Sequence, residues 1–233
     1  MRPGQLTIYS VRPDGIPPEL ASACLTDDEK SRAARFRFPQ DASHWTACRA
    51  ALRRILGQEI GLKPLDVPLV FFEFGKPALA PPFDSLHFNL SHCPDLALIA
   101  LSIDGPVGID LESLERAPDL LECENSFCHP GEILALPAET NARASALLRI
   151  WTAKEAVLKA LGTGLSHPPE QIRILFEQSN ATAQSDSPLA GLEEQSIRIL
   201  ENAAYDGYRV AFSAQALAEN VEILRKGFSW PVS

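Results

Sequence analysis

The chain has 233 residues, of which 45% are hydrophobic and 22% are charged. This composition supports a buried core and excludes a wholly disordered protein, and the length suits one large domain or two small ones. The formal net charge is −9, from 21 Lys and Arg against 30 Asp and Glu, so we expect no nucleic-acid partner. The longest apolar stretch, residues 96–103, is too short to span a membrane, so we expect no membrane partner either.

The start of the sequence and its cysteines indicate a cytoplasmic protein. Residues 1–10 lack the apolar region of a secretory signal. The five cysteines are odd in number and form no Cys-x-x-Cys pair, which is typical of reduced thiols in the cytosol. Cys123, Cys128 and His129 lie close together, but no second pair of ligands follows, so we do not expect a metal cluster there.

Positive charge is concentrated in one part of the chain. Residues 30–54 contain seven Lys and Arg but only one acid, Asp41, so this segment carries +6 and the remainder −15. A basic segment in an acidic protein is consistent with a localised anion site. A solvated helix face explains the same charges equally well.

In the first half of the chain, capping residues and apolar patterns predict two helices and several short strands. Thr26 begins a short helix toward Arg35, and Asp41 caps a longer helix that ends near Gln58. Short apolar segments predict strands over residues 5–11, 69–74, 86–90 and 96–103, and a further strand over 107–111 follows at the start of the second half. The Asp-Gly-Pro turn at 104–106 divides the chain into an N-terminal half, 1–104, and a C-terminal half, 105–233.

The second half of the chain repeats this mixture of helix and strand. A helix is expected from Asn141 to Leu161, ending at Gly162, and strands are expected over 171–176, 197–201 and 208–212. The segment 179–195 is rich in Ser, Ala and Asp and predicts a surface loop or a hairpin. Because strands and helices cluster within each half, we expect an α+β fold rather than a doubly wound sheet.

Two acids alternate with apolar residues near the middle of the chain. On a strand, Ile109 and Leu111 point toward a core, whereas Asp110 and Glu112 point together toward the other face. Neighbouring carboxylates repel each other unless a cation lies between them, and Mg²⁺ suits such a pair. The alternative is a polar strand face at the edge of a sheet.

The helix over 141–161 carries Glu155 and Lys159, which share a face because they are four residues apart. A surface salt bridge is the simple explanation of this pair. However, Glu155 is also available as a third carboxylate beside Asp110 and Glu112. Three carboxylates with a nearby lysine suit phosphoryl-group chemistry.

Two further segments offer groups that bind phosphate. Ser91 and His92 end an expected strand and present a hydroxyl and an imidazole, although a single His is more often structural. The turn Phe74-Gly75-Lys76-Pro77 presents one lysine. It is not a Walker P-loop, because the second Gly and the Ser or Thr after the lysine are missing.

Taken together, these segments resemble one enzyme family. The series GKP at 75–77, FNLSH at 88–92, GIDLE at 108–112 and WTAKEAVLKALGTGL at 151–165 resembles the larger, Sfp-type class of 4'-phosphopantetheinyl transferases. The resemblance covers about residues 26–176 and includes the basic segment. It carries no recognisable feature after residue 179.

The resemblance implies a fold and a reaction. The family fold is a pseudo-dimer of two similar α+β halves with the active site at their junction, the N-terminal half binding the nucleotide and the C-terminal half carrying the Mg²⁺ ligands and catalytic helix. Members transfer the 4'-phosphopantetheine group of coenzyme A to a serine of an apo acyl or peptidyl carrier protein and release adenosine 3',5'-bisphosphate. The implied partners are therefore coenzyme A and a carrier protein, and the implied state is a monomer.

The resemblance also implies roles for single residues. Asp110, Glu112 and Glu155 would hold Mg²⁺; Glu155 would also accept the serine proton, and Lys159 would stabilise the departing phosphate, so that Glu155, Asp110 and Lys159 form the catalytic set. Arg32, assisted by Lys30, would contact the 3'-phosphate. The residues that would bind coenzyme A are Lys30, Arg32, Gly75, Lys76, Pro77, Asn89, Ser91, His92, Asp110, Lys154, Glu155 and Lys159, with Lys154 either a phosphate contact or a solvated charge.

The sequence departs from the family pattern in places. His44 stands where many relatives carry an arginine, and residues 112–140, the region expected to help dock the carrier protein, are hard to align. Arg53 and Arg54 are candidates for contacting an acidic carrier. Two other functions remain open at this point: a non-catalytic module that binds coenzyme A, and a metal-dependent phosphohydrolase.

Overall fold

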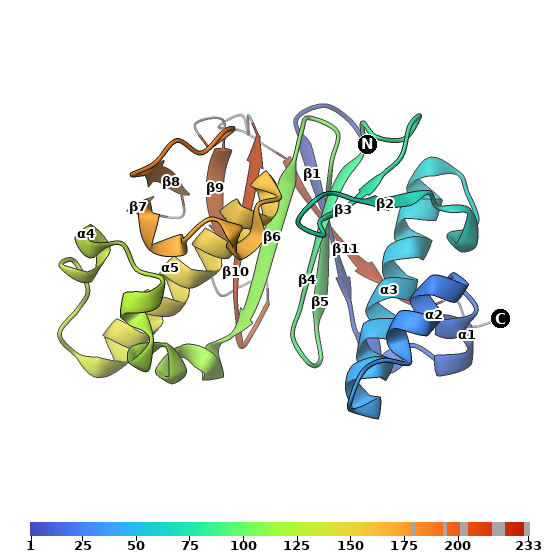
Figure 1. Ribbon diagram of the computed structural model, residues 1–233, viewed down its shortest axis with the longest axis horizontal. Coiled ribbons are helices and arrows are strands. Elements are labelled where there is room, and N and C mark those ends of the chain that lie inside the picture. Colours follow the sequence, from blue (N-terminus) through green and yellow to red (C-terminus); the bar gives the residue numbers. More distant parts are fainter. Residues whose placement is uncertain (179, 193–194, 201–204, 216–221, 231–233) are drawn as a thin grey trace.

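The protein consists of two halves, each built from a β-sheet covered by one long helix (Figure 1). The computed structural model describes residues 1–178, 180–192, 195–200, 205–215 and 222–230. Within these residues, no helix is both long enough and apolar enough to cross a bilayer. The fold is therefore mixed α+β with two halves, as the sequence predicts.

The elements of the first half are β1 (Gln5–Val11), α1 (Pro18–Ser22), α2 (Asp27–Ala33), α3 (Pro39–Ile60), β2 (Leu69–Phe71), β3 (Pro77–Leu79), β4 (His87–His92) and β5 (Ala97–Ser102). Those that follow are β6 (Val107–Ser113), α4 (Pro130–Ile133), α5 (Thr140–Leu161), β7 (Ile172–Glu177), β8 (Asn180–Ser185), β9 (Gln195–Leu200), β10 (Tyr208–Gln215) and β11 (Glu222–Phe228). A 3-10 helix, Leu114–Glu122, follows β6.

The strands form two main sheets. The first has the order β11-β1-β5-β4 and the second the order β6-β10-β9-β8-β7, and β2 pairs with β3 in a separate hairpin. All described pairs are antiparallel except β1 with β11, which run parallel from Gln5 opposite Glu222. The last strand therefore belongs to the first sheet, although it follows the whole second sheet in sequence. The division at residue 104 stays a prediction, and residues 222–228 cross it.

Apolar side chains arrange these parts in four layers, with α3 and α5 on the outside and the two sheets between them (Figure 1). Ile55 and Leu56 of α3 pack on one face of the first sheet. Ile8 and Leu98 of the first sheet pack against the second sheet, and Val157 of α5 packs on the far face of the second sheet. Alternation along β1 and β5 supplies both faces, because successive side chains of a strand point in opposite directions.

Most expected elements are present, with shifted ends. Thr26 and Glu29 form the reciprocal capping box that starts α2. The long helix starts at Pro39 rather than Asp41, because Phe38 is the extended N-cap residue and proline suits the first helical position. Both long helices end at a glycine with positive φ, Gly61 and Gly162.

Three strands, β3, β8 and β11, were not expected as separate elements. Within residues 179–195, expected as a surface loop or a hairpin, β8 pairs with β7 from Ile172 opposite Ser185 and so belongs to the second sheet. Residues 179, 193–194 and 201, on which parts of these expectations fall, lie outside the described residues.

Two side chains of β4 connect the edges of the two sheets. Asn89 Oδ1 accepts a hydrogen bond of 2.9 Å from the backbone N–H of Ile109, and Ser91 Oγ accepts one of 3.2 Å from that of Leu111. Both side chains are buried. The edge strands β4 and β6 are thus joined through side chains, and we call this junction the seam.

Gly108 allows α5 to lie directly against β6. A Cβ at this position would stand 2.0 Å from the carbonyl oxygen of Ala156 and 2.4 Å from the nitrogen of Ala160. Neither backbone atom moves without shifting the helix. The glycine of the GIDLE segment therefore sets the distance between the strand that carries Asp110 and the helix that carries Lys159.

We predict that Gly108→Ala lowers the free energy of unfolding by at least about 2 kcal/mol, because it overpacks a rigid contact. Urea denaturation measures the change. Gly227→Ala on β11 is the matched control, since a Cβ there meets nothing within 4 Å, and it should change stability by less than about 0.5 kcal/mol. Equal stability of Gly108→Ala and wild type would contradict the close approach of α5.

Candidate active site

The acidic residues of β6 face the basic and acidic residues of α5, next to the seam. Ile109 and Leu111 pack into the core between the sheets, whereas Asp110 bonds to Lys159 and Glu112 bonds to Trp151, both on α5. The predicted alternation of the two faces of β6 is confirmed. The close contact at Gly108 brings the α5 side chains within reach of the acids.

Asp110 is buried, and only one of its oxygens has a partner. Oδ1 accepts hydrogen bonds from Lys159 Nζ at 2.5 Å and from Ser91 Oγ at 3.0 Å, and Lys159 also donates to Ser91 at 3.1 Å. Oδ2 is buried without a hydrogen-bond partner. Burial raises the pKa of Asp110, and the Lys159 ammonium opposes this rise. A buried carboxylate oxygen without a partner favours the binding of a further cation.

Ser91 uses its whole hydrogen-bonding capacity at this point. Its hydroxyl donates to Asp110 and accepts from Lys159 and from the backbone N–H of Leu111. A serine hydroxyl has one hydrogen and two lone pairs, so all three are occupied. The same atom therefore joins the sheets and orients the ion pair of Asp110 and Lys159.

Glu112 and Glu155 complete the group of three carboxylates. Glu112 Oε1 accepts a hydrogen bond of 2.8 Å from Trp151 Nε1 and pairs with Arg116. Burial raises the pKa of Glu155, and the charges of Asp110 and Glu112 raise it further while Lys159 lowers it. These three acids influence one another electrostatically, as the sequence predicts.

The carboxylate group fits a divalent cation in its chemistry. Carboxylate oxygens are hard ligands, which Mg²⁺ prefers, and the unpartnered Oδ2 of Asp110 is a buried acceptor that a cation would satisfy. The carboxylates are not drawn tightly together, however. Among the described residues, the one set of three ligand atoms within 4.8 Å of one another is that of His44, Cys48 and His92.

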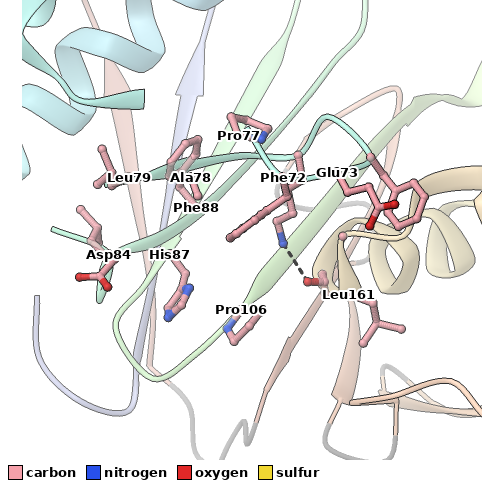
Figure 2. A pocket seen from close by; sticks show the side chains of 15 residues that line it. Phe72, Glu73, Pro77, Ala78, Leu79, Asp84, His87, Phe88, Pro106 and Leu161 are labelled. Carbon is pink, nitrogen blue, oxygen red and sulfur yellow. Dashed lines mark hydrogen bonds between the residues drawn. The ribbon is translucent and has the colours of Figure 1, made fainter. Parts of the chain in front are cut away.

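A pocket of about 410 Å³ lies beside the site (Figure 2). It lies between the β2–β3 hairpin, which carries Phe72 and Pro77, and the end of α5, which carries Leu161 (Figure 2). Gly75, with φ of 81°, makes the hairpin turn. The turn brings Lys76 into the wall of the pocket.

Lys76 ties this hairpin to the second half of the protein. Its ammonium donates to the carbonyl oxygens of Ala160 at 2.8 Å and Val107 at 3.2 Å. Burial lowers the pKa of Lys76 to about 8. The predicted phosphate contact is therefore also a contact between the halves.

A smaller pocket of about 170 Å³ shares Pro77 with the first and is also lined by Asn89, His92, Trp45 and Arg49. The Arg32 guanidinium lies 5.4 Å from the centre of the Trp45 ring. Arg32 and Lys30 are both exposed on or near α2, and Lys30 pairs with Asp27 at 3.3 Å. Of the predicted nucleotide-binding residues, the two pockets thus include Lys76, Pro77, Asn89 and His92, whereas Ser91 lines neither.

Lys154 does not lie at the site. Its side chain is fully buried, and its ammonium contacts Glu132 at 2.7 Å and the carbonyl oxygens of Phe127 at 2.6 Å and Pro169 at 3.0 Å. All three ammonium hydrogens have partners, so none is left for a phosphate. Neither of the two roles considered for Lys154, phosphate contact or solvated charge, describes this position.

Arg53 is likewise unavailable as a surface contact for a carrier protein. It is buried, pairs with Glu29 at 2.7 Å and donates to the carbonyl oxygens of Pro64 and Val67. Arg54 packs over the ring of Trp230. Part of the basic segment is therefore structural. The acid that pairs with Arg53 lies on α2, so the residue spacing along α3 could not reveal the pair.

Sequence reasoning missed the residues that hold Glu112 in place. Trp151 lies four residues before Glu155, and thus on the same face of α5, which was a usable signal for its position. Arg116 follows Glu112 by four residues, but it pairs with Glu112 only because the 3-10 helix after β6 turns the chain back. Nothing in the residue spacing shows that turn.

Comparison with known proteins identifies the family. The model of the 4'-phosphopantetheinyl transferase superfamily matches residues 106–213, and that of the N-terminal part of 4'-phosphopantetheinyl transferases matches residues 13–104. The 4'-phosphopantetheinyl transferase HetI of Nostoc sp. is 38% identical over 178 residues, which are 74% of this chain and 74% of the relative. The chain belongs to the 4'-phosphopantetheinyl transferase superfamily.

Other relatives of this transferase cover similar shares of its length. The 4'-phosphopantetheinyl transferase psf-1 of Bacillus pumilus is 31% identical over 203 residues, which are 84% of this chain and 82% of the relative. Among solved structures, the holo-[acyl-carrier-protein] synthase of Helicobacter pylori in complex with coenzyme A matches 47% of this chain and 99% of its own, at 20% identity and a TM-score of 0.39. The predicted family and enzyme class are confirmed.

We predict that Lys154→Met lowers the free energy of unfolding by about 3–5 kcal/mol, because it leaves the Glu132 carboxylate buried and unpaired. Urea denaturation measures this change in the transferase. Lys30→Met, at an exposed position, is the control and should change stability by less than about 0.5 kcal/mol. A stable Lys154→Met variant with weakened binding of coenzyme A would return Lys154 to the site.

Proposed function

We propose that this transferase moves the 4'-phosphopantetheine group of coenzyme A to a serine hydroxyl of an apo acyl or peptidyl carrier protein. In this reaction the serine oxygen forms a bond to the phosphorus that carries pantetheine, and the bridging P–O bond of the pyrophosphate breaks. The leaving group is adenosine 3',5'-bisphosphate. The observation that carries the proposal is the half-satisfied, buried Asp110 at the seam, beside Lys159, Glu155 and two pockets.

Asp110, Glu112 and Glu155 would hold Mg²⁺, with Asp110 Oδ2 as the buried ligand atom. The ion, when bound, neutralises the pyrophosphate and the charge that grows on the leaving phosphate. Glu112 is already oriented by Trp151 and Arg116, which leaves its second oxygen for this role. The proposal that these acids hold Mg²⁺ depends on Asp110, Glu112 and Glu155 lying near one another on β6 and α5.

Glu155 would accept the proton of the serine hydroxyl. A raised pKa favours this role, because a more basic carboxylate accepts a proton more readily. Lys159, one helical turn further on, would contact the leaving phosphate. Its present pair with Asp110 holds its ammonium at the seam. The proposed base, Glu155, and the ammonium group of Lys159 thus lie on one face of α5.

Coenzyme A would enter from the N-terminal half. Lys76, Pro77, Asn89 and His92 line the two pockets that would take its nucleotide end. Arg32, exposed and close to Trp45, would contact the 3'-phosphate bidentately, which a guanidinium allows. Because both halves already contribute to one site, we propose that the enzyme acts as a monomer, and its five free cysteines suit the cytoplasm.

We predict that Glu155→Gln lowers the rate of transfer at least about 100-fold, because it removes the base and one cation ligand. Apo carrier protein is incubated with coenzyme A and Mg²⁺, and its mass is followed by intact-protein mass spectrometry. Affinity for coenzyme A should stay within about threefold of wild type, since the amide keeps the shape of the carboxylate.

Glu177→Gln, exposed on β7, is the control for this experiment and should transfer at the wild-type rate. Unchanged transfer by Glu155→Gln would remove both roles assigned to this residue. No mass increase on any of several carrier types, with a folded wild-type enzyme, would refute the proposed reaction. Release of free 4'-phosphopantetheine without a carrier would indicate a hydrolase instead.

A second prediction concerns the 3'-phosphate. Arg32→Ala should reduce the preference for coenzyme A over 3'-dephospho-coenzyme A by about tenfold, because one charge-assisted contact is lost. Calorimetric titration with the two ligands measures this preference. Arg37→Ala, also exposed, is the control and should keep the preference. A preference that survives in Arg32→Ala would assign the 3'-phosphate to another residue.

A further inference from the structure

Two histidines and a cysteine meet at the first half's side of the seam, apart from the carboxylates. His44 and Cys48 lie one turn apart on α3, and His92 ends β4. His44 Nε2 lies 2.9 Å from His92 Nδ1 and 3.6 Å from Cys48 Sγ. All three ligand atoms lie within 4.8 Å of one another.

These distances are close to the edges of a zinc tetrahedron. Bonds of about 2.0–2.1 Å to nitrogen and about 2.3 Å to sulfur give edges of about 3.3 Å between two nitrogens and about 3.6 Å between nitrogen and sulfur. The nitrogen–sulfur distance of 3.6 Å already matches. The nitrogen–nitrogen distance of 2.9 Å needs to open by only a few tenths of an ångström.

Burial favours the neutral form of both histidines. It lowers the pKa of His44, against the opposing effects of Asp41 and of the Pro94 backbone, and it lowers the pKa of His92 to about 4. The neutral imidazole is the form that binds a metal.

The charges around the cluster allow a cation. Arg49 acts electrostatically on Cys48 and Lys159 on His92, and each of these cations has an acidic partner: Glu29 lies 3.6 Å from Arg49, and Asp110 lies 2.5 Å from Lys159. The negative charge of Asp41 also acts on His44. Burial raises the pKa of the Cys48 thiol to about 12, so the metal must displace its proton on binding.

The geometry points to a binding site for Zn²⁺ formed by His44, Cys48 and His92. The cysteine and histidine ligands select zinc or a similar transition metal over Mg²⁺, which prefers oxygen. Three protein ligands leave the fourth position to water, because His92 is exposed and opens the cluster to solvent. This site is distinct from the carboxylate group, but Cys48 and His92 also line the smaller pocket proposed for coenzyme A, so metal and coenzyme A would compete there. The site is therefore tested without coenzyme A, and its existence does not depend on the proposed reaction.

Cobalt is the probe for this site, since Co²⁺ replaces Zn²⁺ and reports its ligands by absorbance. The tag-free Cys123→Ser chain, which lacks the exposed thiol, is titrated with Co²⁺ without coenzyme A. We expect one equivalent to bind, with the visible bands of tetrahedral Co²⁺ and a thiolate-to-cobalt charge-transfer band. One equivalent of Zn²⁺ should abolish both signals.

The ligand variants decide between this site and a hydrogen-bonded cluster. Cys48→Ser should lose the charge-transfer band, and His44→Asn should weaken Co²⁺ binding at least tenfold, with folding checked by circular dichroism. If a variant fails to fold, zinc X-ray absorption of the otherwise native chain replaces it and should show one sulfur ligand with nitrogen or oxygen ligands. Absence of the charge-transfer band in the parent chain, its persistence in Cys48→Ser, or a zinc spectrum without sulfur would overturn the proposal.

Discussion

The hydroxyl of Ser91 is the point on which the active site depends. This hydroxyl accepts hydrogen bonds from the backbone N–H of Leu111 and from the Lys159 ammonium, and it donates one to Asp110. One atom therefore joins β4, β6 and α5. Asn89 repeats the junction two residues earlier at Ile109. The core between the sheets holds the halves face to face, and the polar side chains that join their edges at the seam also belong to the site.

The seam also explains the charge pattern of the site. Asp110 is taken out of water with one oxygen bonded and one left without a partner, which is costly unless a cation is near. Lys159 supplies part of that charge. Gly108 keeps α5 close enough for this pairing, so the absence of a side chain at this position affects the electrostatics of the acids.

Local patterns in the sequence predicted much of this arrangement. The capping box at Thr26, the glycine that ends α5, and the two faces of β6 all depend on neighbours along the chain. The return of β11 to the first sheet, and the burial of Lys154 against Glu132, depend on partners that are distant in sequence. Residue spacing within one helix contains no information about such partners, so Lys154 resembled a site residue.

Amide NMR tests most directly whether both halves of the protein bind coenzyme A at the seam. Coenzyme A is titrated into the labelled transferase with Mg²⁺, and chemical-shift changes are mapped. We expect the signals of residues 89–92 of β4, 108–112 of β6 and 155–159 of α5 to change together, at one saturating concentration. Changes confined to one half, or centred on the separate pocket lined by Gly131, Arg149 and Arg173, would contradict it.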